Sequence, residues 1–263
     1  MTPDRRSSVL SVARSYVHRL RAVRLRGFQA LHRRVGDAGR YWSDDSEVGW
    51  KANSHWRGGL SDPDWAQVGL DHLAMFDTFA KALDLPDHPA TVIEWGCGGG
   101  ANAVAFAPRC SHFIAADVSA DSVAECVRQV GQVCDTPTTG LLIDINDAYA
   151  ATVGRENTCD VFLCLYVVEL TAGPEEALRI LDAAQRVLVD GGLAMIQVKY
   201  HTTDRATRGH GRNYRRNLAN MTTFAIDDFW IQAARHGLTP RLITLVPQNR
   251  LDVRYAYYAL TKP

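Results

Sequence analysis

The sequence predicts an α/β protein: a doubly wound, mostly parallel β-sheet that ends in an antiparallel strand and follows an N-terminal helical extension. Three observations lead to this fold class. From residue 91 onward, short apolar runs alternate with amphipathic stretches, as in parallel strands joined by crossover helices. A glycine-rich turn, "WGCGGG", follows the first run. Near the C-terminus, two apolar runs separated by a short turn indicate an antiparallel hairpin.

The segment before the first strand is expected to be mainly helical. Apolar residues recur at helical spacing over 8–34, interleaved with arginines, and predict one basic helix. The stretch 39–59 has little periodicity and several aromatic residues, so we expect an ordered loop there. Ser61 or Asp62 can cap the next helix, which is expected to end near Leu83.

The rest of the chain alternates between strands and helices. The expected strands are 91–95, 112–117, 140–145, 160–166, 193–199, 239–246 and 252–261. The expected helical segments are 101–108, 120–133, 147–153, 174–188 and 226–236. A Gly-Gly pair at 191–192 is expected to end the fourth of these helices, and Gly237 to end the last one.

Charge is unevenly distributed along a chain whose formal net charge is zero. Residues 1–40 hold ten arginines against Asp4 and Asp37, a net charge of +8, which the rest of the chain balances. Such a segment can face nucleic acid or a membrane, and it can also be a solvated helix that docks on an acidic body. We favour the second interpretation.

Composition places the chain among ordinary globular proteins, with 46% hydrophobic and 22% charged residues. None of the six cysteines forms a C-x-x-C pair, which indicates buried thiols in a reducing compartment and neither a disulfide framework nor a zinc site. The sequence shows no signal peptide and no apolar stretch near the ~18 residues that a spanning helix needs. We therefore expect a cytoplasmic protein.

A cofactor site is expected where the first strand meets the glycine-rich turn, because a strand–turn–helix of this kind binds anions and dinucleotides. Gly96, Gly98 and Ala101 also fit the G-x-G-x-x-A spacing of NAD-binding proteins, so the spacing alone does not choose a ligand. Glu94 favours a ligand with an amino group over a dinucleotide, since its carboxylate would attract an amino group and repel a pyrophosphate. Asp117 ends the second strand, where it can bind ribose hydroxyls.

These features together resemble class I S-adenosylmethionine-dependent methyltransferases, whose fold is Rossmann-like. The resemblance covers about 90–263 and rests on E-x-G-x-G-x-G, on Asp117, on Asp144 at the end of the third strand, and on the final hairpin. It implies S-adenosyl-L-methionine as cofactor and S-adenosyl-L-homocysteine as product. The implied contacts are the methionine part for Gly96, Gly98 and Gly100, its amino group for Glu94, the ribose for Asp117, and the adenine for Asp144 and Ile145.

The fourth strand ends in "CLYVVELT" and lacks the N/D-P-P-aromatic motif of enzymes that methylate exocyclic base amines. This difference argues against DNA and many RNA amines as substrates and leaves hydroxyls, carboxylates, carbons and other amines. An alcohol is a poor nucleophile near neutral pH, so a positioned base would help. Glu169 is the first catalytic candidate and His201, after the fifth strand, is the second. Tyr166 is the third.

The stretch "HWRGG" places His55, Trp56 and Arg57 ahead of the sheet. In the family that the chain resembles, N-terminal segments often cover the cofactor, and Arg57 could clamp the methionine carboxylate through two hydrogen bonds. We therefore divide the chain into a basic helix with an aromatic lid loop, 1–60, and a methyltransferase domain, 61–263.

The stretch 201–216 holds five Arg, two His and one Tyr, which can hydrogen-bond sugar hydroxyls or anionic groups. With "EWGCGGGANAV", "IQVKY" and "FAIDDFW", the chain is similar to bacterial sugar O-methyltransferases, including mannoside O-methyltransferases of polysaccharide synthesis. The similarity implies O-methylation of a sugar or of a glycosylated small molecule.

Two other classes of function stay open. One is an RNA methyltransferase that grips phosphates with its Arg-rich N-terminal helix, and the other is a cofactor-binding module without turnover. The sequence shows no clear metal constellation, although Asp144, Asp147 and Glu169 leave a divalent ion open. The acceptor and the oligomeric state, a homodimer included, are also open.

Overall fold

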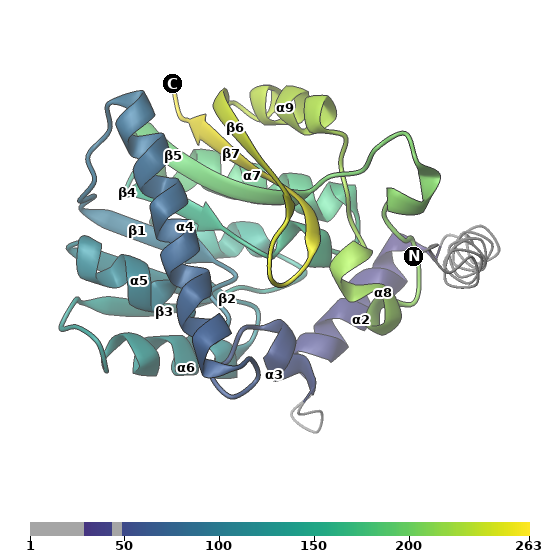
Figure 1. Cartoon of the computed structure of the whole chain (residues 1–263), viewed down its shortest axis with the longest axis horizontal. Helices are drawn as coiled ribbons and strands as arrows, with labels where there is room; N and C mark the ends of the chain where they lie inside the picture. The colour runs from purple at the N-terminus through teal and green to yellow at the C-terminus, as the bar shows by residue number, and fades with distance from the viewer. Residues whose placement is uncertain (1–28, 44–48) are drawn as a thin grey trace, which may run out of the picture.

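The computed structural model describes residues 29–43 and 49–263 and shows, within them, one seven-stranded sheet in the order β3-β2-β1-β4-β5-β7-β6 (Figure 1). The strands are β1 Thr91–Trp95, β2 His112–Asp117, β3 Thr138–Leu142, β4 Cys159–Cys164, β5 Leu188–Lys199, β6 Thr239–Gln248 and β7 Val253–Thr261. Neighbouring strands from β3 to β5 are parallel, whereas β7 runs antiparallel to β5 and β6. The expected fold class is confirmed.

The apolar composition of the central strands follows from their position. β1 and β4 pair in the middle of the sheet, and Ile93 and Phe162 on them are completely buried. A parallel strand is covered by crossover helices on both faces, so it reads as a nearly continuous apolar run. The strands expected at 91–95 and 112–117 agree with β1 and β2 residue for residue.

The third strand ends earlier than the sequence suggested. Leu142, its last residue, pairs with Asp117, the last residue of β2, so the chain beyond it has no strand to pair with. The expectation of a strand over 140–145 was therefore wrong at its C-terminal end. As a result, Asp144 lies in the loop that follows the strand.

The fifth strand begins earlier than expected, at Leu188. The Gly191 N–H donates to the Lys262 carbonyl (2.9 Å), so the Gly-Gly pair lies inside the strand and does not end the preceding helix. The sequence pattern missed this because the partner lies more than 70 residues away.

Helices cover both faces of the sheet. The described helices are α2 Leu31–Trp42, α3 Gly49–Asn53, α4 Asp62–Leu83, α5 Ala103–Phe106, α6 Ala120–Val130, α7 Pro174–Val187, α8 Tyr214–Asn217 and α9 Ile226–Arg235. α4, α5 and α6 pack on one face, and α7 and α9 pack on the other. Ser61 caps α4 as expected, since its hydroxyl accepts the N–H of Asp64 (3.3 Å).

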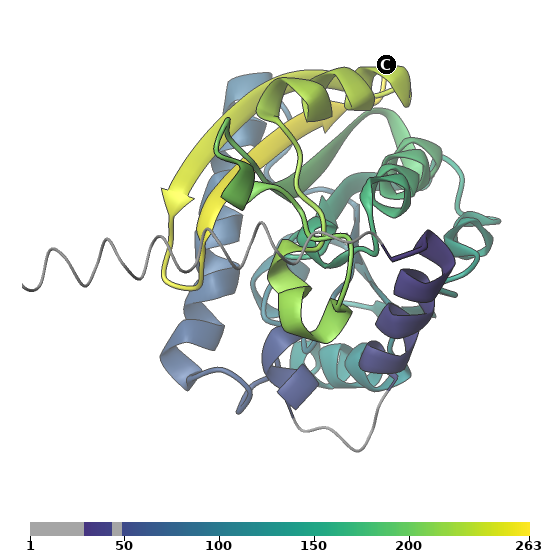
Figure 2. The same cartoon turned by 90° about the vertical axis from the view of Figure 1, so that its right-hand side faces the viewer.

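The N-terminal part differs from the expectation. The helix expected over 8–34 lies mostly outside the described residues, and the stretch expected as a loop contains the end of α2 and all of α3. Tyr41 and Trp50 bury their rings in one cluster with Tyr214 of α8. Trp42 also donates its indole N–H to the Tyr214 hydroxyl (2.8 Å), so α2 and α8 lie side by side (Figure 2).

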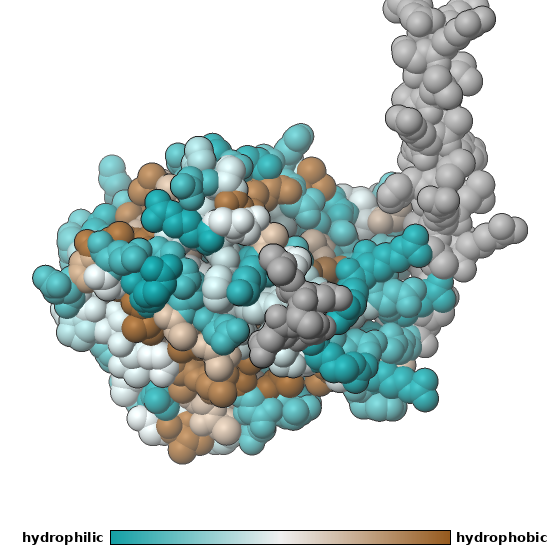
Figure 3. Space-filling view, turned by 90° about the horizontal axis from the view of Figure 1, so that it is seen from below, coloured by the Kyte–Doolittle hydropathy of each residue, from teal (hydrophilic) through white to brown (hydrophobic). Residues whose placement is uncertain are grey.

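The surface offers no segment for crossing a bilayer: among the described helices, none is long and apolar enough to span one. Figure 3 shows hydrophobic residues next to hydrophilic ones on the face seen from below.

Gly69 tests the packing of α4 against the glycine turn. A Cβ on Gly69 would lie 2.2 Å from the Ala101 carbonyl oxygen. Gly69→Ala should therefore lower the free energy of unfolding by about 1–3 kcal/mol, although a Gly→Ala change inside a helix normally stabilises by ~1 kcal/mol. Urea unfolding measures the difference. Gly36→Ala in α2 is the control, because the nearest atom is the end of the Arg40 side chain at 3.6 Å. A Gly69→Ala chain as stable as the wild type would contradict the packing.

Candidate active site

The glycine turn between β1 and α5 is held by Asp117 at the end of β2. Gly96 and Gly98 have φ angles of +84° and +50°, which glycine adopts without strain. One Asp117 oxygen accepts the N–H of Gly98 and the other accepts the N–H of Ser119, both at 2.9 Å. The carboxylate thus fixes the turn at the switch in strand order between β1 and β4, where α/β sheets bind their ligands.

The segment 53–56 packs directly on the glycine turn. It begins at the last residue of α3, and we call it the lid segment. The Gly99 N–H donates to the Ser54 carbonyl (2.7 Å), and a Cβ on Gly98 would lie 2.2 Å from the same oxygen. A Cβ on Gly99 would lie 2.6 Å from the Cα of Trp56. The glycines are therefore needed to admit the lid backbone as well as to form the turn.

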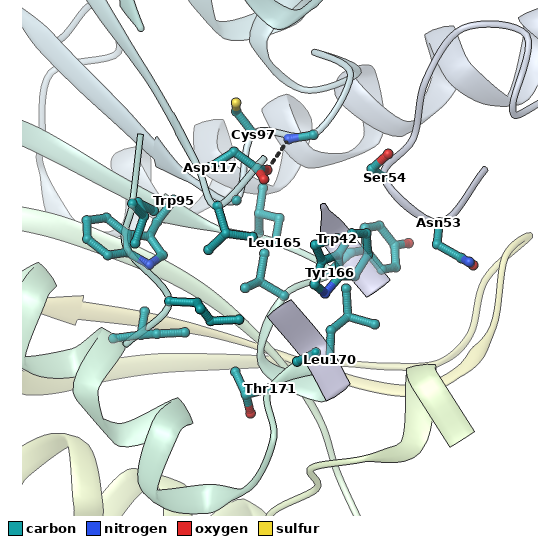
Figure 4. A pocket seen from close by; sticks show the side chains of 18 of the residues that line it. Trp42, Asn53, Ser54, Trp95, Cys97, Asp117, Leu165, Tyr166, Leu170 and Thr171 are labelled. Atoms are coloured by element: carbon teal, nitrogen blue, oxygen red, sulfur yellow. Dashed lines mark hydrogen bonds between the residues drawn. The ribbon is translucent and has the colours of Figure 1, made fainter. Parts of the chain in front are cut away.

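A cavity lies between the glycine turn, the end of β4 and the lid segment (Figure 4). Its polar and aromatic lining residues include Trp42, Asn53, Ser54, His55, Trp95, Asn102, Asp117, Tyr166, Thr171, Glu176 and Tyr214. Its apolar lining residues include Val118, Ile143, Ile145, Leu165 and Leu170. A mostly apolar wall with a few placed polar groups is typical of small-molecule sites.

Tyr166 is held in the cavity wall by hydrogen bonds to two neighbours. It has a φ of +58°, a conformation rare for a bulky residue. Its backbone N–H donates to the Gln197 side chain and its hydroxyl accepts the Asn249 side-chain N–H, both at 2.7 Å. Burial raises the pKa of its phenol to about 12, so the phenol is protonated near neutral pH. The strained backbone aims the ring at the lid segment.

His55 of the lid segment meets Tyr166 in the cavity. The two rings contact edge to face with centroids 4.8 Å apart, and His55 also has a positive φ of +53°. Burial, followed by the neighbouring His72, lowers the pKa of His55 to about 4, so the imidazole is neutral near neutral pH. The sequence indicated His55 only as part of a lid, because no local pattern places it against the end of β4.

A chain of buried polar groups runs behind the cavity from β1 to β7. Asn102 donates its amide N–H to Glu94 (2.7 Å), so its oxygen accepts from Nδ1 of His72 (2.7 Å). Nε2 of His72 then accepts from the Tyr257 hydroxyl (2.9 Å). The other oxygen of Glu94 has no hydrogen-bond partner among the residues that the structure describes, and burial raises the Glu94 pKa to about 8. The carboxyl is therefore protonated at neutral pH.

The residues expected to bind the cofactor separate into two groups. Gly96, Gly98, Asp117 and Ile145 line the cavity. Gly100 packs instead against α6, where a Cβ would lie 3.1 Å from the Cα of Cys126, and Glu94 is buried behind the turn.

Asp144 and Arg57 lie at the surface and outside the cavity wall. Asp144 is exposed, and its carboxylate accepts the N–H of Asn146 (2.8 Å). Arg57 is exposed and contacts Asp62 (3.4 Å). The structure therefore gives Arg57 a partner on α4, where the sequence suggested a clamp on the cofactor.

The catalytic candidates also separate. Tyr166 lines the cavity, whereas Glu169 is buried below it and accepts the Tyr255 hydroxyl (3.1 Å). Its other oxygen has no partner in the described part of the chain, and burial raises the Glu169 pKa to about 7. His201 lines a second cavity, with Nδ1 3.2 Å from the Thr223 hydroxyl. The ring of Tyr166 contacts His55, His72 and Tyr255, and of these only His55 lines the first cavity.

Residues 29–43 and 49–263 contain no group of three or more His, Cys, Asp or Glu side chains that could hold a metal ion. Asp144, Asp147 and Glu169 accordingly do not form such a group.

The segment that carries the glycine turn, Asp117 and Tyr166 matches a known family. A family model described as "Methyltransferase domain" matches residues 92–192. Residues 92–192, less than half of the chain, are therefore similar to a methyltransferase domain. A search of curated proteins found no match to the chain.

Solved structures share its fold. Magnesium protoporphyrin IX methyltransferase from Synechocystis PCC 6803, with bound SAH, aligns with a TM-score of 0.60 and 14% identity over 85% of this chain and 97% of that chain. The N-methyltransferase NodS from Bradyrhizobium japonicum WM9, in complex with S-adenosyl-l-homocysteine, gives 0.57 and 13% over 88% and 98%. The 1,6-didemethyltoxoflavin-N1-methyltransferase from Burkholderia thailandensis gives 0.57 and 15% over 90% and 92%. At these identities the likeness shows the fold alone.

Glu94 should make the stability of the ligand-free protein depend on pH. Its pKa of about 8 in the folded chain lies above the ordinary 4.5, so the folded state holds the proton more tightly and stability falls as pH rises from about 4.5 to 8. Glu94→Gln keeps an acceptor for Asn102 and does not titrate. It should raise the free energy of unfolding by about 2–4 kcal/mol at pH 9, with little change at pH 4. Urea unfolding at several pH values measures this, with the exposed Glu175→Gln as control. Equal pH slopes in wild type and Glu94→Gln would refute it.

Proposed function

We propose that this protein is an S-adenosylmethionine-dependent methyltransferase that transfers a methyl group to a hydroxyl of a saccharide or of a glycosylated small molecule. The observation that carries the proposal is the pair of His55 and Tyr166 in the cavity wall, with ring centroids 4.8 Å apart. An alcohol needs a nearby base to become a good nucleophile. The imidazole of His55 is neutral near neutral pH, so it can accept the hydrogen bond and then the proton of such an alcohol.

The cavity residues fit S-adenosyl-L-methionine, which supplies an electrophilic methyl group on a sulfonium when bound. Gly96 and Gly98 would pass beneath its methionine part. Each Asp117 oxygen accepts one backbone N–H, and a carboxylate has capacity for further bonds, which ribose hydroxyls would use. Ile145 and the neighbouring Asp144 are the proposed adenine contacts. The SAH bound to two of the similar structures supports this choice of cofactor.

Residues outside the cavity wall would support this site from behind. Glu94 holds Asn102, a lining residue, through a 2.7 Å hydrogen bond. Gly100 lets the turn pack closely on α6. Arg57 contacts Asp62 at the start of α4, so its contribution would be to fix the end of the lid segment.

An aromatic wall supports a saccharide as the acceptor. Trp42 and Tyr214 line the same cavity as His55, and the hydrogen bond between them fixes the orientation of both rings. Aromatic faces with a few polar groups beside them suit the C–H faces and hydroxyls of a sugar ring. Asn53 and Ser54 of the lid segment are the polar groups beside this wall.

In the reaction, His55 would take the hydroxyl proton at its imidazole as the hydroxyl oxygen bonds to the methyl carbon. The bond between that carbon and the sulfonium sulfur would break, and S-adenosyl-L-homocysteine would leave. Tyr166 would keep the imidazole in place, because Gln197 and Asn249 fix the tyrosine at both ends. The lid segment would exclude water by its bond to the glycine turn. Positioning of this kind supplies most of the rate in reactions that need little other chemistry.

The cofactor assignment predicts that the chain binds S-adenosyl-L-homocysteine and not NAD. Asp117→Ala should weaken the binding of the homocysteine compound by about 1–3 kcal/mol, since it removes the ribose acceptor. Isothermal calorimetry with both ligands measures this. Asp121→Ala, on the first turn of α6, is the control for a lost surface carboxylate. Tight NAD binding without a response to S-adenosyl-L-homocysteine would overturn the assignment.

The base assignment predicts that His55→Gln lowers kcat by about 10²–10⁴ and leaves S-adenosyl-L-homocysteine affinity within a few-fold. Transfer of a labelled methyl group to a panel of glycosides measures the rate. In the wild type, kcat should rise with pH through about 4, where His55 loses its proton, and then stay level.

Two matched variants show whether another residue is the base. Glu169→Gln and His201→Ala should keep kcat near the wild-type value, because neither side chain lines the cavity. A collapse of kcat in either variant, with His55→Gln active, would move the base to that residue. Transfer to RNA and to no glycoside would refute the saccharide acceptor.

A further inference from the structure

We propose that a second cavity beside the first binds a phosphate group of the methyl acceptor. The inference rests on the proposed function and narrows its acceptor to a phosphorylated saccharide. The cavity, which we call the basic cavity, is lined by side chains that include Arg34, His201, Arg208, Met221, Thr222 and Thr223.

The lining of the basic cavity carries positive charge without an acidic residue. Arg34 and Arg208 are two guanidinium groups, and His201 adds an imidazole. The sequence before Gln29 is also basic, with seven Arg and one acid, Asp4, in residues 1–28. A ligand that enters this cavity is therefore favoured if it is an anion.

Arg34 is poised to donate into the basic cavity. One of its terminal nitrogens donates to the Ala172 carbonyl, which fixes the guanidinium beside Gly173. Its Nε is buried and has no hydrogen-bond partner within the described residues. A buried donor without an acceptor costs free energy, and a phosphate oxygen would relieve that cost. Guanidinium groups bind phosphate through pairs of parallel hydrogen bonds.

Arg208 and His201 supply further donors. Arg208 is exposed, and its side chain forms no hydrogen bond or ion pair with the residues that the structure describes. His201 uses Nδ1 for the Thr223 hydroxyl (3.2 Å), which leaves Nε2 for a ligand. The charges that act on His201 from neighbouring elements are those of Arg208, Arg254 and Asp228. Two guanidiniums and one ring nitrogen can meet the several oxygens of a phosphate group.

Hydrogen bonds join the linings of the two cavities. Thr171 and Ala172 line the first cavity, and each accepts a hydrogen bond from a residue that lines the basic cavity. Arg34 holds the Ala172 carbonyl, and the Thr222 hydroxyl donates to the Thr171 carbonyl (3.0 Å). An acceptor ring in the first cavity can therefore extend a phosphate substituent past these residues to the basic cavity.

Binding of inorganic phosphate tests the basic cavity directly. In calorimetry with the full chain and S-adenosyl-L-homocysteine, phosphate should bind, and Arg208→Ala should weaken it at least tenfold. Arg216→Ala on α8 removes the same charge from an exposed position outside the cavity and should change the affinity less than twofold. Absence of phosphate binding, or equal losses in both variants, would overturn the proposal.

Methyl transfer to a neutral glycoside and to its phosphate monoester separates this inference from the proposed function. Arg208→Ala should raise KM for the monoester about tenfold, the effect of one lost charged hydrogen bond. It should leave kcat within twofold and methyl transfer to the neutral glycoside unaffected.

If phosphate binding depends on Arg208 while no hydroxyl is methylated, the proposed function fails and the basic cavity stands. If hydroxyls are methylated equally with and without the phosphate, the basic cavity fails alone. Salt-sensitive RNA binding that Arg208→Ala and Arg216→Ala weaken equally would replace both by a nucleic-acid surface.

Discussion

The hydrogen bond from the Gly99 N–H to the Ser54 carbonyl joins the lid segment to the sheet, and the shape of the active site depends on it. The same carbonyl oxygen leaves no room for a Cβ on Gly98. Because Ser54 is fixed, the next residue, His55, is placed against Tyr166. Three parts of the chain that are distant in sequence thus meet through one contact between backbones.

Much of the fold could be predicted because parallel strands are specified locally. Ile93 and Phe162 belong to short apolar runs whose burial on both faces determines their composition. The errors arose where pairing decides the boundary. β3 stops at Leu142 because β2 has ended, and β5 extends through Gly191 because a distant carbonyl accepts its N–H. Neither partner can be read from the segment itself.

The candidate site could be predicted in part. The adjacent strands β1 and β2 end just before Gly96 and Gly98 and at Asp117, so topology alone brings these residues together. Side chains in the longer connections were less predictable. Glu169 turns inward to Tyr255, and His55 of the lid segment lies beside Tyr166. The position of the His55 ring depends on a left-handed backbone at both His55 and Tyr166, which no spacing of residue types reveals.

β7 lies between β5 and β6 although it follows both along the chain. Until residues 253–261 have been synthesised, β6 has no neighbouring strand in the sheet, and the edge of β5 is open. The hairpin must therefore join the sheet as a unit, after the parallel strands can already have assembled. Tyr257, which ends the polar chain from Glu94, and Asn249, which holds the Tyr166 hydroxyl, arrive only with this hairpin. Completion of the candidate active site is thereby coupled to a late step in folding. An intermediate with only the parallel strands would lack the contacts that order the cavity wall.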